Sequence, residues 1–123
     1  MNPIYRRQVS LVSLDEQTVV RGQAGKRPAL ILSNNDFNNR SNSGLVFIVP
    51  ITRAIRPFAS HVPLEQPEGG LKYDSSIMCE QVKSVSTERL VKPLGTVSEV
   101  NVRRAEEIIS GLLELPFWKI YSS

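Results

Sequence analysis

Two apolar segments joined by a polar one place the strongest constraint on the fold of this chain. Residues 28–32 and 45–49 are short apolar runs of strand length, and residues 33–44 between them are rich in Asn and Ser. Asn and Ser favour turns because their side chains hydrogen-bond to nearby backbone groups. The pattern predicts two strands connected by a polar hairpin loop.

Several more short strands are expected elsewhere in the chain. Three segments have the composition of strands: residues 8–14, 60–64 and 75–85. The first alternates polar and apolar residues at period two, as a strand buried on one face does. The second contains Pro63, which favours a sheet edge because proline has no N–H to donate. In the third, Glu80 and Gln81 interrupt the apolar pattern, which predicts one or two strands, followed by a short helical turn at Ser86.

One long helix is expected near the C-terminus, at about residues 98–115. Thr96 and Glu99 have the spacing of a capping box, and Ser98 is the alternative N-cap. Pro116 ends the helix. Apolar residues recur at intervals of three or four, which marks one buried face: Val102, Ala105, Ile108, Ile109, Leu112 and Leu113. Short strands followed by one helix predict an α+β fold, a small antiparallel β barrel covered by the helix, as one domain over residues 1–123.

Composition disfavours export and membrane insertion. No apolar run approaches the roughly 20 residues that a membrane-spanning helix needs, and the N-terminal residues lack the apolar stretch of a signal peptide. Cys79 is the single cysteine, so no internal disulfide forms, which fits a reducing compartment. A cytoplasmic protein without a membrane partner is expected.

Positive charge is concentrated in the first half of the chain. Residues 1–60 hold eight Lys/Arg and three Asp/Glu, a net +5, whereas residues 61–123 hold seven and nine, a net −2. Such an excess favours a surface that binds polyanions, because fixed positive charge attracts phosphates. An ordinary solvated basic surface explains the same numbers.

The sequence offers little for metal or nucleophilic catalysis. One histidine, His61, and one cysteine cannot build a His/Cys zinc site or a Ser-His-Asp triad, and no P-loop is present. Both residues are interpreted as parts of strands. In RNA, however, the neighbouring 2′-OH is the nucleophile, so a protein need only position the phosphate, stabilise its growing charge and transfer two protons. Arg27 and Thr52 suit that task, although each is also an ordinary residue for a strand end.

Four segments of the chain resemble motifs of the MazF/PemK family, which are mRNA endoribonuclease toxins of toxin–antitoxin pairs. RPALILSNNDFN is similar to the family's Arg-Pro strand and following loop, and FIVPIT to its Val-Pro-x-Thr strand end. SSIMCEQVKSVSTERL resembles the segment with the acidic-Gln pair, and LGTVSEVNV the linker into the last helix. The resemblance covers roughly residues 6–113.

The resemblance implies an SH3-like barrel with a C-terminal helix, in a homodimer whose RNA channel crosses the subunit interface. It implies sequence-specific cleavage of single-stranded RNA without a metal or cofactor, leaving a 2′,3′-cyclic phosphate and a 5′-OH, and an acidic antitoxin as partner. It places Arg27 and Thr52 at the catalytic positions. The residues expected to contact RNA are Arg53, Glu80, Gln81, Asn34 and Asn38.

Two parts of the chain depart from the family pattern. Residues 7–13 lack its Gly-Asp and aromatic residues, and Gly22 occupies a position where a carboxylate is expected, which leaves the general base unassigned. The C-terminal Phe117-Trp118 resembles the end of CcdB-type toxins, which share the barrel fold and act on DNA gyrase. The alternatives are therefore a non-catalytic gyrase toxin, an inactive member that only binds nucleic acid or antitoxin, or a tail that simply packs on the domain.

Overall fold

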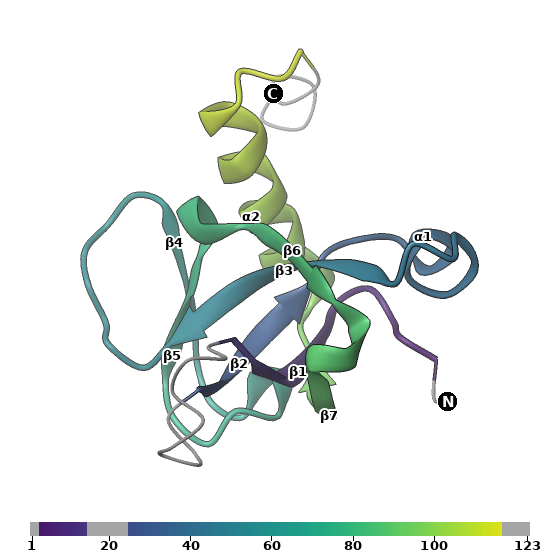
Figure 1. The fold of residues 1–123 in the computed structure, drawn as a ribbon. Coiled ribbons are helices and arrows are strands. Elements are labelled where there is room, and N and C mark those ends of the chain that lie inside the picture. Colours follow the sequence, from purple (N-terminus) through teal and green to yellow (C-terminus); the bar gives the residue numbers. More distant parts are fainter. Residues whose placement is uncertain (1–2, 15–24, 117–123) are drawn as a thin grey trace.

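The sheet of this protein is organised around one long central strand, β3. The computed structural model describes residues 3–14 and 25–116 (Figure 1). Within these residues the strand order is β4-β5-β3-β2-β1-β7, and β6 also pairs with β3. The strands are β1 (Gln8–Ser13), β2 (Lys26–Ile31), β3 (Leu45–Thr52), β4 (His61–Leu64), β5 (Ser75–Met78), β6 (Lys83–Ser86) and β7 (Leu90–Thr96). The helices are α1 (Asn35–Arg40) and α2 (Glu99–Leu112), and three 3₁₀ turns are η2 (Glu68–Gly70), η3 (Cys79–Gln81) and η4 (Thr87–Arg89).

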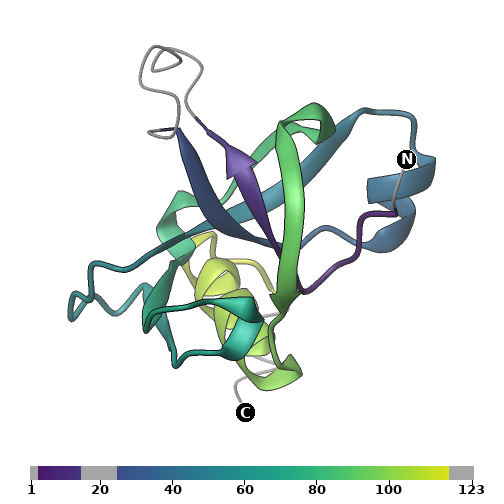
Figure 2. The ribbon, with the colours of Figure 1, turned by 90° about the horizontal axis from the view of Figure 1, so that it is seen from below.

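The two halves of β3 have different neighbours on one side. Its first four residues pair with β6, and Ile51 and Thr52 pair with Ile77 and Ser76 of β5. The sheet therefore curves around β3, as two perpendicular views show (Figures 1 and 2). Helix α2 packs against β4 and η3 and projects beyond the sheet. The predicted α+β fold, a curved antiparallel sheet with a C-terminal helix, is confirmed.

Two hydrophobic clusters lie on opposite faces of β2 and β3. Leu30 and Val49 pack in the cluster that contains Ala105 of α2. Their neighbours Ala29 and Ile48 belong to the second cluster. Successive side chains of a strand point to opposite faces, so a strand buried on both faces reads as a continuous apolar run. This explains the uninterrupted apolar segments that first marked these strands.

Most elements agree with the sequence-based expectations. The segments at 8–14, 28–32, 45–49 and 60–64 form β1 to β4, and β4 lies at one end of the strand order, as Pro63 indicated. Residues 75–85 form two strands separated by η3. Ser86 caps η4 by accepting the N–H of Glu88 at 3.2 Å.

The start of α2 decides between the two predicted caps. Ser98 is the N-cap, and its hydroxyl accepts the N–H of Asn101 at 3.3 Å. Thr96 belongs to β7, so the capping-box alternative is wrong. The helix ends at Leu112, three residues before the predicted end.

The polar segment at 33–44 is not a simple hairpin loop, because it contains helix α1. The Asn34 side chain accepts the N–H of Phe37 at 2.8 Å, which satisfies one of the free donors at a helix start. The Ser41 hydroxyl donates to the Phe37 carbonyl at 2.7 Å at the other end. Asn and Ser therefore act here as helix caps rather than as turn formers.

Strand β7 was not expected, and its last residues, Leu94–Thr96, were interpreted as part of a linker, which was wrong. It pairs with β1 across two register shifts. Pro93 and Gly95 weaken its strand signal, but Gly95 allows η2 to pack closely on the strand. A Cβ at Gly95 would lie 2.5 Å from backbone atoms of Gly69 and Gly70, closer than any side chain tolerates.

Among the described helices, none has an apolar stretch that is long enough to cross a bilayer.

Candidate active site and nucleic-acid interface

Arg27 and Thr52 lie at the ends of two paired strands. The β2–β3 register runs from Ile31↔Ile48 to Ala29↔Pro50. Continued by two residues, this register would bring Arg27 opposite Thr52. Strand alternation then directs both side chains to the face that carries Ala29 and Ile48, the face away from α2. Directly opposed residues of paired strands have Cβ atoms about 5 Å apart, so pairing continued this far would let one phosphate meet both side chains.

The hydroxyl of Thr52 is already oriented by the backbone. Thr52 Oγ1 accepts the N–H of Ala54 at 3.1 Å, and the residue is half-buried. A hydroxyl has one hydrogen to donate beside two lone pairs. Because one lone pair holds the backbone N–H, the hydrogen is left to donate to an anion.

Arg27 differs from the arginines of the N-terminal segment in having no ion pair with a described residue. It is exposed, whereas Arg6, Arg7 and Arg40 each pair with a carboxylate. A guanidinium presents a planar fork of donors that matches two phosphate oxygens and stays charged at every physiological pH. Arg27 can therefore serve as an anion-binding group.

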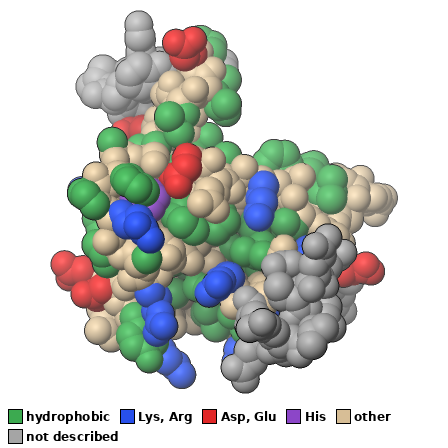
Figure 3. All heavy atoms as spheres, turned by 60° about the vertical axis from the view of Figure 1, so that its left-hand side comes forward, with side chains coloured by type: hydrophobic (Ala, Val, Ile, Leu, Met, Phe, Trp, Pro, Cys, Tyr) green, Lys and Arg blue, Asp and Glu red, His purple; other side chains and the backbone are tan. Residues whose placement is uncertain are grey.

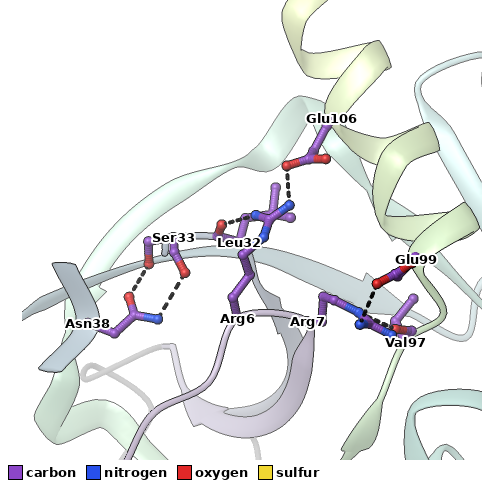
Figure 4. A network of polar contacts seen from close by, with 8 residues as sticks. All are labelled: Arg6, Arg7, Leu32, Ser33, Asn38, Val97, Glu99 and Glu106. Atoms are coloured by element: carbon purple, nitrogen blue, oxygen red, sulfur yellow. Dashed lines mark hydrogen bonds and ion pairs between the residues drawn. The ribbon is translucent and has the colours of Figure 1, made fainter. Parts of the chain in front are cut away.

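Arg6 and Arg7, in contrast, join the N-terminal segment to α2 (Figure 4). The Arg6 guanidinium donates to the carbonyl of Leu32 and to the carboxylate of Glu106. Arg7 Nε donates to the Val97 carbonyl at 3.1 Å, and Nη1 donates to Glu99 at 3.3 Å. These two basic residues hold the fold together, and the distribution of charge along the sequence did not distinguish them from Arg27.

Arg53 follows Thr52 and lies flat against an aromatic ring. Its Cζ atom is 4.3 Å from the ring centroid of Tyr73, a cation–π contact. Both residues are exposed. The predicted phosphate-binding role of Arg53 is compatible with this geometry, and Tyr73 was not singled out from the sequence.

Glu80 and Gln81 lie on η3, next to strand β4. The Ser60 hydroxyl donates to Glu80 Oε1 at 2.7 Å, and His61 Nε2 is 3.2 Å from Oε2. Burial acts to raise the pKa of Glu80, but the hydrogen bonds from Ser60, its own backbone and His61 outweigh it, so the pKa lies below the ordinary value. Glu80 is thus held as a carboxylate beside β4, while Gln81 is exposed.

The two asparagines predicted to contact RNA have structural partners. Asn34 caps α1, as described above, and is exposed. Asn38 is buried: its Nδ2 donates to the Ser33 carbonyl at 2.9 Å, and its Oδ1 accepts from the Ser33 hydroxyl. Asn39 exchanges two 2.8 Å hydrogen bonds with the backbone of Ile4. Base contacts by Asn34 and Asn38 stay a prediction.

The interpretation of His61 as a strand residue is confirmed, whereas Cys79 lies on η3 directly after strand β5 and not in a strand. Cys79 is fully buried, and burial raises the pKa of its thiol to about 12, so it packs as a small apolar residue. His61 is a buried residue of β4 whose ring meets Phe58 edge-on at 5.1 Å. In the part of the chain that the structure describes, no three His, Cys, Asp or Glu residues gather into a metal site.

Two sequence-based hypotheses lie outside the described residues. The segment around Gly22, with the missing carboxylate, is in residues 15–24, and Phe117-Trp118 is in residues 117–123.

The face that carries β4 and β5 shows Lys and Arg side chains among hydrophobic ones over its lower part (Figure 3).

The known proteins that are similar in sequence to this chain are described as endoribonucleases. Endoribonuclease MazF9 of Mycobacterium tuberculosis is 33% identical over 97 residues, which cover 76% of this chain and 80% of that protein. Endoribonuclease MazF of Staphylococcus epidermidis is 32% identical over 108 residues, covering 82% of this chain and 88% of the relative.

Solved structures share the fold. The crystal structure of MazF from Deinococcus radiodurans superposes with a TM-score of 0.76 at 19% identity, covering 94% of this chain and 100% of that chain. A mycobacterial endoribonuclease in complex with its cognate antitoxin gives a TM-score of 0.72 at 22% identity, covering 94% and 98%. Residues 5–113 match the sequence profile of the PemK-like, MazF-like toxins of type II toxin–antitoxin systems, and this chain therefore belongs to that family.

Proposed function

We propose that this protein is an endoribonuclease toxin that cleaves single-stranded RNA at specific sequences without a metal. The ribose 2′-oxygen attacks the adjacent phosphorus while the bond from phosphorus to the 5′-oxygen breaks. The 2′-OH loses its proton to a base, and the departing 5′-oxygen gains one. The products are a 2′,3′-cyclic phosphate and a 5′-OH, so neither water nor a protein nucleophile is consumed. Relatives described as endoribonucleases support this reaction class.

Arg27 and Thr52 are the proposed catalytic residues. The observation that supports this assignment is the β2–β3 register, whose continuation by two residues would bring Arg27 and Thr52 opposite one another at the strand ends. Arg27 stabilises the charge that develops on the phosphorane oxygens, and its fork matches two of them. Thr52 donates its remaining hydrogen to a non-bridging oxygen, because Ala54 already occupies one lone pair.

The remaining predicted residues extend this site along the RNA. Arg53 adds affinity for a neighbouring phosphate, and Gln81 on η3 offers an exposed amide to a base. Glu80, fixed as a carboxylate by Ser60 and His61, accepts a base N–H. Exposed Asn34 contacts RNA through the amide atoms that its capping bond leaves free, and buried Asn38 supports the same segment through its bonds to Ser33.

Two protein partners follow from charge and exposed apolar surface. We expect a homodimer, because exposed Phe58 and Leu112 line a groove of about 860 Å³ between β4 and α2. We expect an acidic antitoxin segment, because the net +5 of residues 1–60 suits a polyanion that mimics RNA. A solved relative in complex with its antitoxin supports the second partner.

A long RNA incubated with the purified protein in EDTA tests the reaction. Cleavage should persist in the chelator, and the fragments should carry 5′-OH ends that a kinase labels without prior phosphatase treatment. Arg27→Ala should abolish most cleavage, whereas Arg103→Ala, which removes an exposed arginine of α2, should not. RNA that stays intact across many sequence contexts would refute the proposal.

A further inference from the structure

Tyr73 and Arg53 form an exposed pair at the same end of the sheet as Thr52. The guanidinium lies over the phenol ring at 4.3 Å from its centroid, yet Tyr73 is still 56% exposed. The tyrosine hydroxyl makes no hydrogen bond to a described residue, so the hydroxyl does not account for a tyrosine here and the exposed ring is left to contact a ligand.

Register and loop contacts fix where this ring lies. Ser76 pairs with Thr52 across β5 and β3, and Tyr73 precedes Ser76 by three residues. The Ser75 hydroxyl donates to the Tyr73 carbonyl at 2.8 Å, and the Asp74 carboxylate accepts the N–H of Gln66 at 3.0 Å. The chain is therefore anchored at Tyr73 and at the residue after it, while the Tyr73 side chain faces solvent.

The pair has the chemistry of a single-stranded nucleic-acid platform. A base stacks on an aromatic face, and an arginine beside it meets the adjoining phosphate. Tyrosine loses little conformational entropy on such contact because it has only two side-chain torsions. Arg53 makes no ion pair with a carboxylate in the described residues, so its charge is available to RNA.

We propose that Tyr73 is a base-stacking residue that receives the base of a nucleotide flanking the scissile phosphate, with Arg53 held across its ring and in contact with the RNA backbone. This inference rests on the proposed RNA cleavage at Arg27 and Thr52 and names how the same site selects its substrate. A purine at the stacked position binds more tightly than a pyrimidine, because its larger ring system stacks over more area.

The test uses one cleavage site mapped on a long RNA with the wild-type protein. Short oligonucleotides that contain this site carry a 2′-deoxy sugar at the attacking nucleotide, so they bind without being cut. A series of these oligonucleotides replaces each flanking base in turn with an abasic residue. Wild type should lose about 5- to 150-fold in affinity at one position, the range for one stacked base.

Tyr73→Ala should lose the same factor on the intact oligonucleotide and nothing further when that one base is removed. Tyr73→Phe should restore wild-type affinity, because it keeps the ring and removes only the hydroxyl. Tyr5→Ala is the matched control, since Tyr5 is 50% exposed and no cation–π contact involves it within the described residues. Cleavage by Tyr73→Ala of the corresponding all-ribose RNA should show a raised KM with little change in kcat.

The measurements distinguish failure of the proposed RNA cleavage from failure of the proposed base stacking. Wild type that cleaves no RNA refutes the proposed function. Wild type that cleaves, with Tyr73→Ala binding equally well or losing affinity evenly at every abasic position, overturns base stacking alone. A Tyr73→Ala variant that binds RNA normally but loses affinity for an acidic peptide would assign the ring to a protein partner and also overturn the inference.

Discussion

The arginines at the two ends of the sheet have opposite surroundings. At one end, Arg6 and Arg7 are occupied by Leu32, Val97 and two carboxylates of α2. At the other, Arg27 has no ion pair with a described residue, and Arg53 touches only the face of Tyr73 among the contacts described. Arg6 and Arg7 therefore use their guanidinium donors for hydrogen bonds within the fold.

This difference separates basic residues that stabilise the fold from those that can bind a ligand. A guanidinium already paired with carboxylate and carbonyl oxygens has few donors left for phosphate. An unpaired one keeps its whole fork and its full attraction for RNA. Net charge alone does not reveal this, because both kinds contribute equally to the excess in residues 1–60.

The largest effect is expected at Arg27. If it stabilises charge that appears only in the transition state, Arg27→Ala should slow cleavage by about 10²–10³-fold. Arg27→Lys should also be poor, because an ammonium lacks the planar fork. Single-turnover rates on a short RNA measure both variants. Near wild-type rates for Arg27→Lys would show that charge alone suffices.

A somewhat smaller effect is expected at Thr52. Thr52→Val keeps the shape of the side chain and removes the hydroxyl, so cleavage should fall about 10- to 100-fold, the scale of one hydrogen bond to a charged group. Thr52→Ser should retain part of the rate because it keeps the donor. Thermal unfolding provides the control, since both variants should fold. Equal rates for Thr52→Val and wild type would remove Thr52 from the mechanism.

Arg6 should affect stability instead of catalysis. Arg6→Ala removes hydrogen bonds to Leu32 and Glu106 at a partly exposed site, so the free energy of unfolding should drop by about 1–2 kcal/mol. The variant should cleave RNA at the wild-type rate below its melting temperature. Urea unfolding and cleavage assays at the same temperature measure the two quantities. A selective loss of cleavage would contradict the comparison of the two arginine groups.

Substitutions at Asn34 test whether the asparagine-rich segment stabilises the fold through its helix cap. Asn34→Ala removes the cap of α1 and should cost about 1 kcal/mol of stability. Asn34→Asp and Asn34→Ser, which can still cap, should restore it. If Asn34 also reads a base, Asn34→Ser will recover stability without recovering RNA affinity, which fluorescence anisotropy measures.

The smallest expected effect is the pH dependence of the Ser60–Glu80 hydrogen bond. The pKa of Glu80 is lower in the folded protein than in the unfolded chain, so this contribution is fully present above the ordinary carboxyl pKa. It is lost as pH falls through the lowered pKa. Ser60→Ala should therefore lower the free energy of unfolding by no more than about 1 kcal/mol at pH 7 for so exposed a group, with a small fall in Tm, and the Tm difference should shrink at pH 3. A Tm difference that grows on acidification would contradict this account.

The sequence was sufficient to predict the two strands that carry Arg27 and Thr52, because short strands buried on both faces have a strong local signal. β2 and β3 pair from Ala29↔Pro50 to Ile31↔Ile48, so Arg27 and Thr52 lie two residues beyond the paired segment, at the same end of it. Strand β7 was not predicted, because Pro93 and Gly95 disfavour a strand locally. Its close packing against η2 cannot be read from the local sequence.

The remaining details depend on contacts between distant residues. Glu106 is 100 residues from Arg6, so no spacing rule connects them. An asparagine amide caps a helix and reads a base with the same atoms, so composition cannot separate the two roles of Asn34. The Arg53–Tyr73 contact likewise requires the geometry of two loops.

The most direct test of the account compares rate, affinity and stability for Arg27→Ala and Arg6→Ala on the same RNA. Single-turnover cleavage, binding to a non-cleavable 2′-deoxy analogue and thermal unfolding are measured for each variant. Arg27→Ala should lose far more rate than affinity and keep its Tm, while Arg6→Ala should lose Tm and keep its rate. Equal losses of rate and affinity for Arg27→Ala would show a simple phosphate anchor and contradict the catalytic assignment.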